Sequence, residues 1–88
     1  MKTIYLESFE RDIRKLKEIK IKSELLELID YIKESGSLTE IKNLKKIKGE
    51  KKFYRIRVGD YRLGIKIENE TVTFIRFLHR KDIYRYFP

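Results

Sequence analysis

The sequence predicts an α+β fold in which an antiparallel helical hairpin packs on one face of a sheet. Two observations indicate this class. Residues 9–32 carry apolar side chains at three- and four-residue spacing, which is typical of amphipathic helices. Residues 53–79 carry them in alternation, which is typical of half-buried strands. Because the period changes only once, we expect one helical layer on one sheet, within a single domain over residues 1–88.

The N-terminal half predicts a strand followed by two helices. Residues 1–6 alternate loosely and indicate a short strand, and Ser8 is suited to cap a helix that starts near Phe9. We expect a break at residues 20–22 and a second helix that ends at Gly36, a residue suited to a left-handed C-cap. Helices joined so closely should form an antiparallel hairpin. Their apolar stripes are Phe9, Ile13, Leu16 and Ile19, then Leu25, Leu28, Ile29 and Ile32.

A short stretch connects the helices to the sheet. Ser37 and Glu40 have the spacing of a capping box, which predicts one further helical turn. Residues 44–48 predict a strand or an extended approach to one. An antiparallel meander should follow, with strands at residues 53–58, 61–68 and 72–79.

The first hairpin of this meander predicts a face rich in arginine. Gly59 and Asp60 form a two-residue link of the kind that closes a tight hairpin. Such a link sets the facing pairs as Val58 with Tyr61, Arg57 with Arg62, Ile56 with Leu63, and Arg55 with Gly64. The apolar members then lie under the helices, and the opposite side carries Arg55, Arg57, Arg62 and Lys66.

The pairing of Arg57 with Arg62 points to an anionic ligand. Like charges directly opposite each other destabilise a sheet, and an anion would compensate for them. Alternatively, both arginines splay into water or pair with an acid elsewhere. Gly64 lies beside them and would leave the surface open to the backbone of a ligand.

The third strand has two possible faces. A three-residue loop at 69–71 would place Ile75 and Phe77 in the core, with Phe74, Arg76 and Leu78 on the arginine face. A two-residue loop would reverse these positions. Arg76 joins the arginines only in the first case.

The last ten residues add candidates for binding and chemistry, namely His79, Arg80, Lys81, Tyr84 and Tyr86. The tyrosine rings are suited to stacking on nucleobases. Tyr86 and Phe87 are alternatively plugs that hold the C-terminus to the core. His79 is either an ordinary hydrogen-bonding residue or a group that moves a proton near neutral pH.

Charge and composition limit the possible partners. The net charge is +8, and all of the excess lies in residues 45–88, which indicates a surface that binds polyanions. The lysine run that includes Lys46, Lys51 and Lys52 is either a solvated turn or a track for phosphates. The chain has no cysteine and one histidine, which argues against disulfides and zinc sites. No apolar stretch resembles a membrane span or a signal peptide, so we expect a cytoplasmic protein without a cofactor.

Three motifs resemble those of a known family. They are Tyr54-Arg55-Ile56-Arg57, Gly59-Asp60-Tyr61-Arg62-Leu63 and His79-Arg80-Lys81-Asp82-Ile83-Tyr84. With the order of strand, helical hairpin and meander, they resemble the RelE/ParE superfamily of toxins from bacterial toxin–antitoxin modules over nearly the whole chain.

The resemblance implies an activity and its residues. The RelE branch consists of endoribonucleases that cut messenger RNA in the ribosomal A site, where the 2′-hydroxyl of the RNA itself would attack without a metal. The implied partners are a small acidic antitoxin, messenger RNA and the 70S ribosome. The resemblance assigns Arg55, Arg57, Arg62, Arg80 and either Tyr84 or Tyr86 to the site. Together with the residues chosen from their own chemistry, the predicted catalytic residues are Arg57, Arg62, His79, Arg80 and Tyr84. The predicted RNA-binding residues are Lys46, Lys51, Lys52, Arg55, Lys66, Arg76, Lys81 and Tyr86.

One departure from the family and several alternatives stay open. The best-known relatives have lysines on the strand where this chain has Arg55 and Arg57. Arginine stays protonated and is a poor base, which leaves His79 and the tyrosines as candidates for the base. The alternatives are a ParE-like inhibitor of DNA gyrase, a basic nucleic-acid-binding module without chemistry, and a degenerate toxin.

Overall fold

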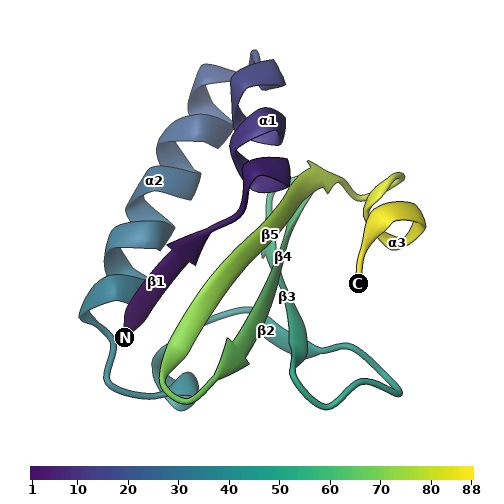
Figure 1. Cartoon of the computed structure of the whole chain (residues 1–88). Coiled ribbons are helices and arrows are strands. Elements are labelled where there is room, and N and C mark those ends of the chain that lie inside the picture. The colour runs from purple at the N-terminus through teal and green to yellow at the C-terminus, as the bar shows by residue number, and fades with distance from the viewer.

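The computed structural model of the chain describes residues 1–88, except for the side chain of residue 38. It contains a five-stranded sheet in the order β1-β5-β4-β3-β2 (Figure 1). The strands are β1 (Lys2–Tyr5), β2 (Leu44–Lys46), β3 (Phe53–Val58), β4 (Tyr61–Glu68) and β5 (Thr71–His79). The helical segments are α1 (Glu7–Lys15), α2 (Ile19–Glu34), the 3-10 turn η1 (Leu38–Glu40) and α3 (Ile83–Tyr86). The predicted α+β class and the order of strand, helical hairpin and meander are confirmed, whereas α3 was not predicted.

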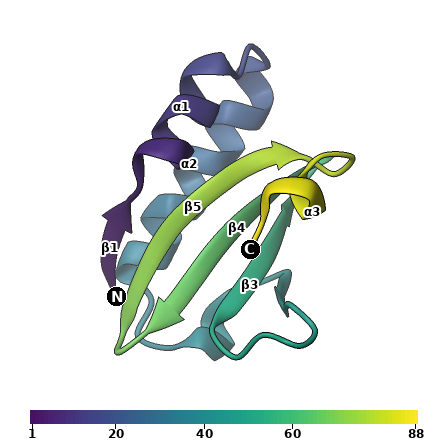
Figure 2. The same cartoon turned by 45° about the vertical axis from the view of Figure 1, so that its right-hand side comes forward.

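The helices lie on the two sides of the sheet. α1 and α2 run side by side in opposite directions and form one layer, whereas α3 lies on the other side, in front of β3 and β4 in Figure 2. β1 pairs in parallel with β5, and all other strand pairs are antiparallel. The face of the sheet that α3 only partly covers is the one on which the arginines were predicted.

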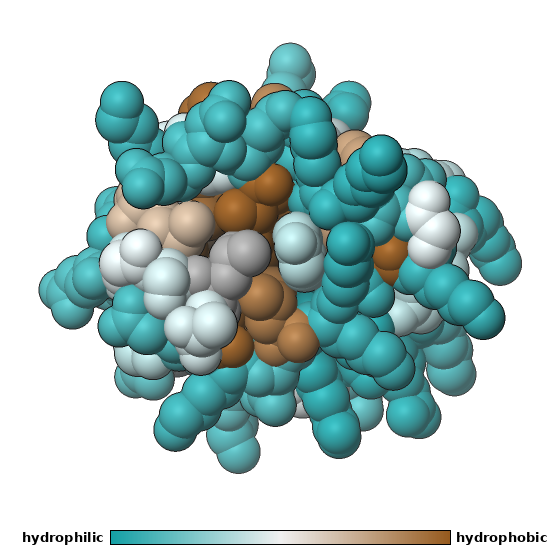
Figure 3. All heavy atoms as spheres, turned by 90° about the horizontal axis from the view of Figure 1, so that it is seen from below, coloured by the Kyte–Doolittle hydropathy of each residue, from teal (hydrophilic) through white to brown (hydrophobic). Residues whose placement is uncertain are grey.

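The apolar core lies between the helical layer and the sheet. Tyr5 stacks on Phe74 with ring centroids 4.9 Å apart, and Phe9 lies 5.3 Å from Phe74. The predicted stripe of the second helix is confirmed, because Leu25, Ile29 and Ile32 are buried. From the end at which the β4–β5 turn lies, hydrophilic residues surround a small apolar patch (Figure 3). No helix in the described part of the chain has both the length and the apolar character needed to cross a bilayer.

The β3–β4 hairpin has the predicted register. Arg57 pairs with Arg62 and Arg55 pairs with Gly64. Gly59 has a φ of 58°, a left-handed conformation that glycine adopts without strain, which explains its place in a two-residue turn. The position of the arginines therefore follows from the turn.

The β4–β5 connection has the two-residue turn of one predicted alternative and the outward-facing Arg76 of the other. Asn69 and Glu70 form the turn, both with positive φ, so the three-residue loop is wrong. A bulge then shifts the register, because Gly64 pairs with Arg76 and the next residue of β4 pairs with Phe74. Phe74 is fully buried under the helices and does not lie on the arginine face. The extra residue in β5 returns Arg76 to that face.

Helix α1 docks on this bulge. Ser8 lies inside the first turn of α1 and donates from Oγ to the Ile75 carbonyl at 2.6 Å, so its predicted role as a helix cap is wrong. One helical turn later, Asp12 accepts the backbone N–H of Phe77 at 2.9 Å. Asp12 also accepts two hydrogen bonds from Arg76, at 2.8 and 3.0 Å. α1 thus satisfies backbone groups of β5 beyond Phe74, the last residue of β5 that pairs with β1.

Three smaller predictions concern the ends of α2. The break between the helices lies at residues 16–18 instead of 20–22, because α2 already begins at Ile19. Ile19 is 84% exposed and does not belong to the apolar stripe. Gly36 does not have positive φ, so it is not a left-handed cap; α2 ends at Glu34, and Ser35 bonds back to the carbonyl of Tyr31.

The predicted turn before the sheet is confirmed. The Glu40 carboxylate accepts the backbone N–H of Ser37 at 3.0 Å, as a capping box requires. The same oxygen accepts the N–H of Gly36 at 2.8 Å. β2 then follows within the predicted residues 44–48.

Candidate functional site

Two rows of residues cross the sheet on the face opposite α1 and α2. The register places Arg55, Gly64 and Arg76 in one row and Arg57, Arg62 and Leu78 in the next. Ile56 and Leu63, which alternate with the arginines, are buried under the helices. Because neighbouring side chains of a strand point to opposite faces, the arginines lie on the outer face.

The β3–β4 turn holds the guanidinium of Arg62 in place. Its Nη1 donates to the carbonyl oxygens of Gly59 at 3.0 Å and Tyr61 at 2.9 Å. Arg62 is half-buried, whereas Arg57 opposite it is exposed. The turn that sets the strand register therefore also orients one arginine toward a ligand that would approach this face.

Arg62 lies within a group of like charges. Burial lowers the pKa of Arg62 from its ordinary value, and the charges of Arg55, Arg57 and Arg80 lower it further, whereas Tyr84 has the opposite effect. We call the four arginines the arginine cluster. Among the described side chains, none of the four arginines forms an ion pair. The alternative in which they pair with an acid does not apply to this part of the chain.

The tail brings Tyr84 beside the cluster. Its side chain is 59% exposed, and it borders a hollow of about 390 Å³ between β2, β3 and α3. The lining residues are Lys45, Lys46, Ile47, Lys48, Arg55 and Tyr84. Lys45 begins the lysine run that was predicted as either a solvated turn or a track for phosphates. It pairs with Arg55 across β2 and β3, which places it on the same face as that arginine.

Gly64 does not leave an open surface, contrary to the sequence prediction. A Cβ built on Gly64 would lie 2.7–2.9 Å from three ring carbons of Phe87. Phe87 is 2% exposed and meets Phe53 edge-on, with ring centroids 5.8 Å apart. The ring of Phe87 thus fills the space expected for a ligand backbone, and the prediction of a plug at the C-terminus is confirmed for this residue.

Three predicted RNA-binding residues have acidic partners. The two hydrogen bonds that Arg76 donates to the Asp12 carboxylate raise the pKa of Arg76, and the Asp12 side chain is 7% exposed. Lys52 and Lys66 both contact Glu68, and the bond from Lys52 lowers the pKa of that carboxyl. The charge of Arg76 is therefore largely neutralised within the fold.

His79 lies on the other side of the sheet from the arginine cluster. It pairs with Tyr61, whose side belongs to the helical layer, and the two rings meet edge-on with centroids 5.6 Å apart. Its Nδ1 accepts the backbone N–H of Lys81 at 3.2 Å. The structure therefore separates this histidine from the arginines with which it was grouped.

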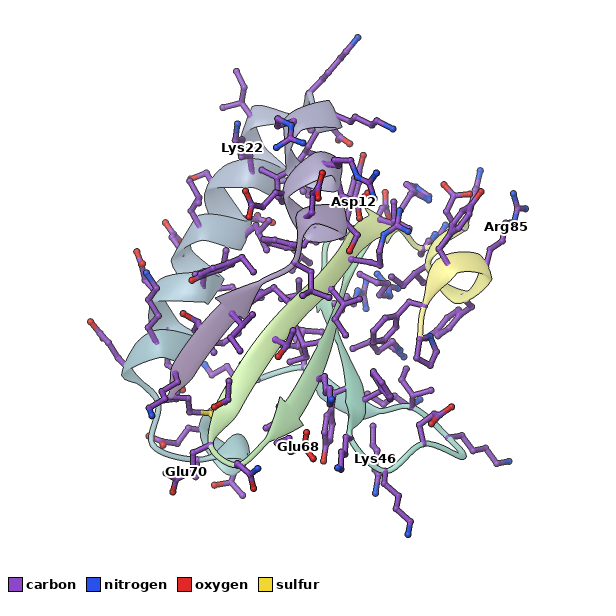
Figure 4. The ribbon with its side chains drawn as sticks, in the orientation of Figure 1. Asp12, Lys22, Lys46, Glu68, Glu70 and Arg85 are labelled. Atoms are coloured by element: carbon purple, nitrogen blue, oxygen red, sulfur yellow. The ribbon has the colours of Figure 1, made fainter. Side chains whose placement is uncertain are left out.

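The remaining predicted residues lie around the edge of the site. Lys46 and Lys51 are exposed at and beyond the end of β2, where the side chain of Lys46 extends into solvent (Figure 4). Lys81 is exposed in the turn before α3. The ring of Tyr86 faces Arg76, whose guanidinium carbon lies 5.3 Å from the ring centroid, a cation–π contact. Tyr86 is thus tied to a structural ion pair.

These features define a class of protein. A helical hairpin covers one face of a small sheet. The opposite face carries the arginine cluster, which has no ion-pair partner among the described side chains, beside an aromatic tail. Such an arrangement is suited to binding a phosphate backbone.

Comparisons with known proteins identify the family to which the chain belongs. Residues 4–84 match the family model described as the ParE toxin of the type II toxin-antitoxin system parDE. The chain is 42% identical to Toxin RelE3 of Methanocaldococcus jannaschii over 89 residues, which covers all of both chains. The chain belongs to the RelE/ParE superfamily of toxins from type II toxin–antitoxin systems, in which it is similar to RelE proteins.

Solved structures show the same fold. The toxin chain in a RelB-RelE antitoxin-toxin complex from Methanococcus jannaschii matches with 40% identity and a TM-score of 0.81, over 97% of this chain and 99% of that one. The RelBE2 toxin-antitoxin complex from Mycobacterium tuberculosis matches with 26% identity and a TM-score of 0.67, over 90% and 96% of the two chains.

Proposed function

We propose that this toxin is an endoribonuclease that cleaves messenger RNA in the ribosomal A site and thereby inhibits translation. The arginine cluster is the observation that carries the proposal. The charges of its other three arginines act on Arg62, and none of the four has an acidic partner among the described side chains. Repulsion of this kind disfavours the free protein, and a bound polyanion relieves it. Similarity to a protein named RelE3 supports the ribonuclease branch of the superfamily.

The reaction takes its nucleophile from the RNA. The 2′-oxygen attacks the adjacent phosphorus and loses its proton, while the bond from phosphorus to the 5′-oxygen breaks and that oxygen gains a proton. The products are a 2′,3′-cyclic phosphate and a free 5′-hydroxyl. No metal or protein nucleophile enters this balance, so the protein has to hold the phosphate in line and stabilise the charge of the transition state.

The cluster residues divide these tasks. Arg62 is held by two backbone carbonyls, so its guanidinium is already oriented when the negative charge on the phosphate increases. Arg57 and Arg80 are exposed and contribute further donors to the phosphate oxygens. Tyr84 supplies the hydroxyl beside the cluster that can carry a proton, which the permanently protonated arginines cannot do. Its exposed ring can also stack on a base.

A second candidate function is inhibition of DNA gyrase. It is favoured by the family model that matches, because that model is described as a ParE toxin. The two functions place different demands on the site. A ribonuclease needs hydrogen-bond donors arranged around one phosphate, whereas an inhibitor of gyrase needs only a surface that gyrase recognises.

We predict that expression of this chain alone stops growth by stopping translation. Primer extension on a highly translated message should show new 5′ ends within minutes of induction, and purified protein should cut messenger RNA on programmed 70S ribosomes. Intact messages together with a loss of supercoiling by gyrase would instead support the second candidate. A toxic protein that affects neither process would contradict both.

A small acidic antitoxin is the proposed partner in the cell. The excess charge of +8 in residues 45–88 gives the sign of the partner, and the uncovered arginine cluster gives a reason for it. Both of the similar structures described above are complexes of a toxin with an antitoxin. We expect a disordered acidic segment that folds on binding, as a helix or strand over the sheet or the helical hairpin.

We predict that salt slows the association of this complex and has much less effect on its dissociation. Between about 50 and about 500 mM salt, the association rate constant should fall roughly tenfold, because screening shortens the range over which opposite charges steer the two proteins. The dissociation rate should change much less, since apolar contacts of the partner would limit release. Surface plasmon resonance with the product of the neighbouring gene measures both rates. An association rate that does not change with salt would contradict the role of charge.

A further inference from the structure

The C-terminal tail is anchored on the arginine face by one aromatic side chain. Phe87 packs directly on the backbone of Gly64, where any Cβ would lie 2.7–2.9 Å from its ring. Gly64 does not have positive φ, so the close contact, and not the backbone conformation, explains a glycine here. The ring of Phe53 packs edge-on against that of Phe87, with the two ring centroids 5.8 Å apart.

Helix α3 has little stability of its own. It spans only Ile83–Tyr86, and a single turn does not persist in water without tertiary contacts. Ile83 and Phe87 are the only buried residues of the described segment 80–88, so they fix the helix to the sheet. Tyr86 adds an exposed contact to the guanidinium of Arg76.

Tyr84 depends on these anchors for its position. It lies one residue after Ile83 and three before Phe87, so its exposed ring is carried by the part of the chain that the anchors hold. The ring borders the hollow next to Arg55, and Tyr84 contributes to the electrostatic environment of Arg62. Tyr84 itself has no hydrogen-bond partner among the described residues. The anchors, and not contacts of its own, place it over the cluster.

We propose that Gly64 and Phe87 are positioning residues, whose contact holds Tyr84 over the arginine cluster for the cleavage of RNA. The inference rests on the proposed ribonuclease function. In this proposal the ring of Phe87 does not touch the substrate. Phe87 fixes helix α3 to the sheet by packing on the backbone of Gly64. Misplacement of a catalytic group by about an ångström can cost up to about a hundredfold in rate.

The test adds a methyl group at residue 64, where it would clash with the ring of Phe87. Gly64→Ala should displace Phe87 and release α3, while every charged side chain and the core under the helices stay unchanged. Phe87→Ala removes the anchor from the other side. Gly36→Ala is the matched control, because its Cβ meets only a carboxylate oxygen of Glu40 at 3.5 Å, far from the site. Thermal unfolding followed by circular dichroism shows that each variant is folded.

The first readout is independent of activity. Trypsin cuts after Arg80, Lys81 and Arg85, so release of the tail, followed by mass spectrometry, reports how firmly α3 is docked. Release should be at least about fivefold faster in Gly64→Ala and Phe87→Ala than in the wild-type and Gly36→Ala proteins, because opening exposes the cleavage sites. Equal release rates in all four proteins would overturn the anchoring role.

The second readout separates positioning from stability. Single-turnover cleavage of messenger RNA on programmed 70S ribosomes should be slowed about ten- to a hundredfold by Gly64→Ala, with a much smaller change in the toxin concentration at half-maximal rate. In a Tyr84→Ala background, Gly64→Ala should have almost no further effect, because the residue that it misplaces is absent. A full additional loss in that background would overturn the proposal. A wild-type protein that does not cleave RNA would refute the proposed function itself, which the variants alone cannot do.

Discussion

Replacement of Arg62 by alanine is expected to slow RNA cleavage by about a hundred- to a thousandfold. The guanidinium of Arg62 is half-buried and held by the carbonyls of Gly59 and Tyr61, so it is oriented before the substrate arrives. A donor fixed in this way stabilises the charge of a transition state at little cost in reorganisation. Arg62→Lys should restore only part of the rate, because an ammonium group does not bind two phosphate oxygens in a fork. Single-turnover cleavage on programmed ribosomes measures the effect.

The same substitution should leave the protein as stable as before or slightly more stable. Arg57 faces Arg62 directly, and like charges across a strand pair repel. Loss of one member removes the repulsion, although exposure of Arg57 to solvent keeps the gain small. Urea unfolding measures this change. A loss of stability together with a normal cleavage rate would show that Arg62 serves the fold.

Arg85→Ala is the matched control for this experiment. Arg85 lies on α3, close in sequence to Tyr84, but its side chain points away from the sheet into solvent (Figure 4). It has the same charge as Arg62, so both variants lower the net charge by one. A cleavage rate reduced equally by the two substitutions would indicate that total charge matters and that the orientation of Arg62 does not.

The sequence predicted the arginine face well because a short turn determines it. Gly59 and Asp60 allow only one register for β3 and β4, and strict alternation then assigns every side chain to a face. The helices were also predicted correctly as elements, since their apolar stripes are long. Their ends were less accurate: Ile19 continues the periodic pattern but lies at the exposed start of α2.

Contacts between distant segments were the part that the sequence did not predict. Nothing near Gly64 indicates that Phe87 will cover it, because the contact joins residues that are far apart along the chain. The side on which His79 lies depends on its pairing with Tyr61, which requires the register of β5. That register includes a bulge, and a bulge of one residue leaves no clear signal in an alternating strand.

One signal for the contact between helix α1 and β5 was present in α1. Ser8 and Asp12 are four residues apart, so both lie on one side of a helix, next to the apolar residue Phe9. In the structure these two side chains bond to the carbonyl of Ile75 and the N–H of Phe77. Polar side chains at the edge of a buried stripe can therefore indicate backbone groups that need partners.

Asp12→Ala is expected to reduce the free energy of unfolding by about 3 kcal/mol. The variant leaves the guanidinium of Arg76, 23% exposed, without a counter-charge, and the Phe77 N–H without an acceptor. For a chain of this size, such a loss corresponds to a decrease in Tm of roughly 12–24 °C. Asp12→Asn should cost less, because the amide oxygen can still accept one hydrogen bond. Urea and thermal unfolding followed by circular dichroism measure both variants.

Two further proteins identify the cause of that loss. Glu10→Ala removes an exposed acid from the same helix and should change the stability by no more than about 0.5–1 kcal/mol. The double variant Asp12→Ala, Arg76→Met removes both charges and should recover at least half of the loss, because an apolar pair can replace a buried ion pair without a large penalty. If the double variant is no more stable than Asp12→Ala alone, the missing acceptor for the Phe77 N–H is the main cause. If Glu10→Ala destabilises the protein as much as Asp12→Ala does, helix α1 depends on its acidic residues in general and not on the contact with β5.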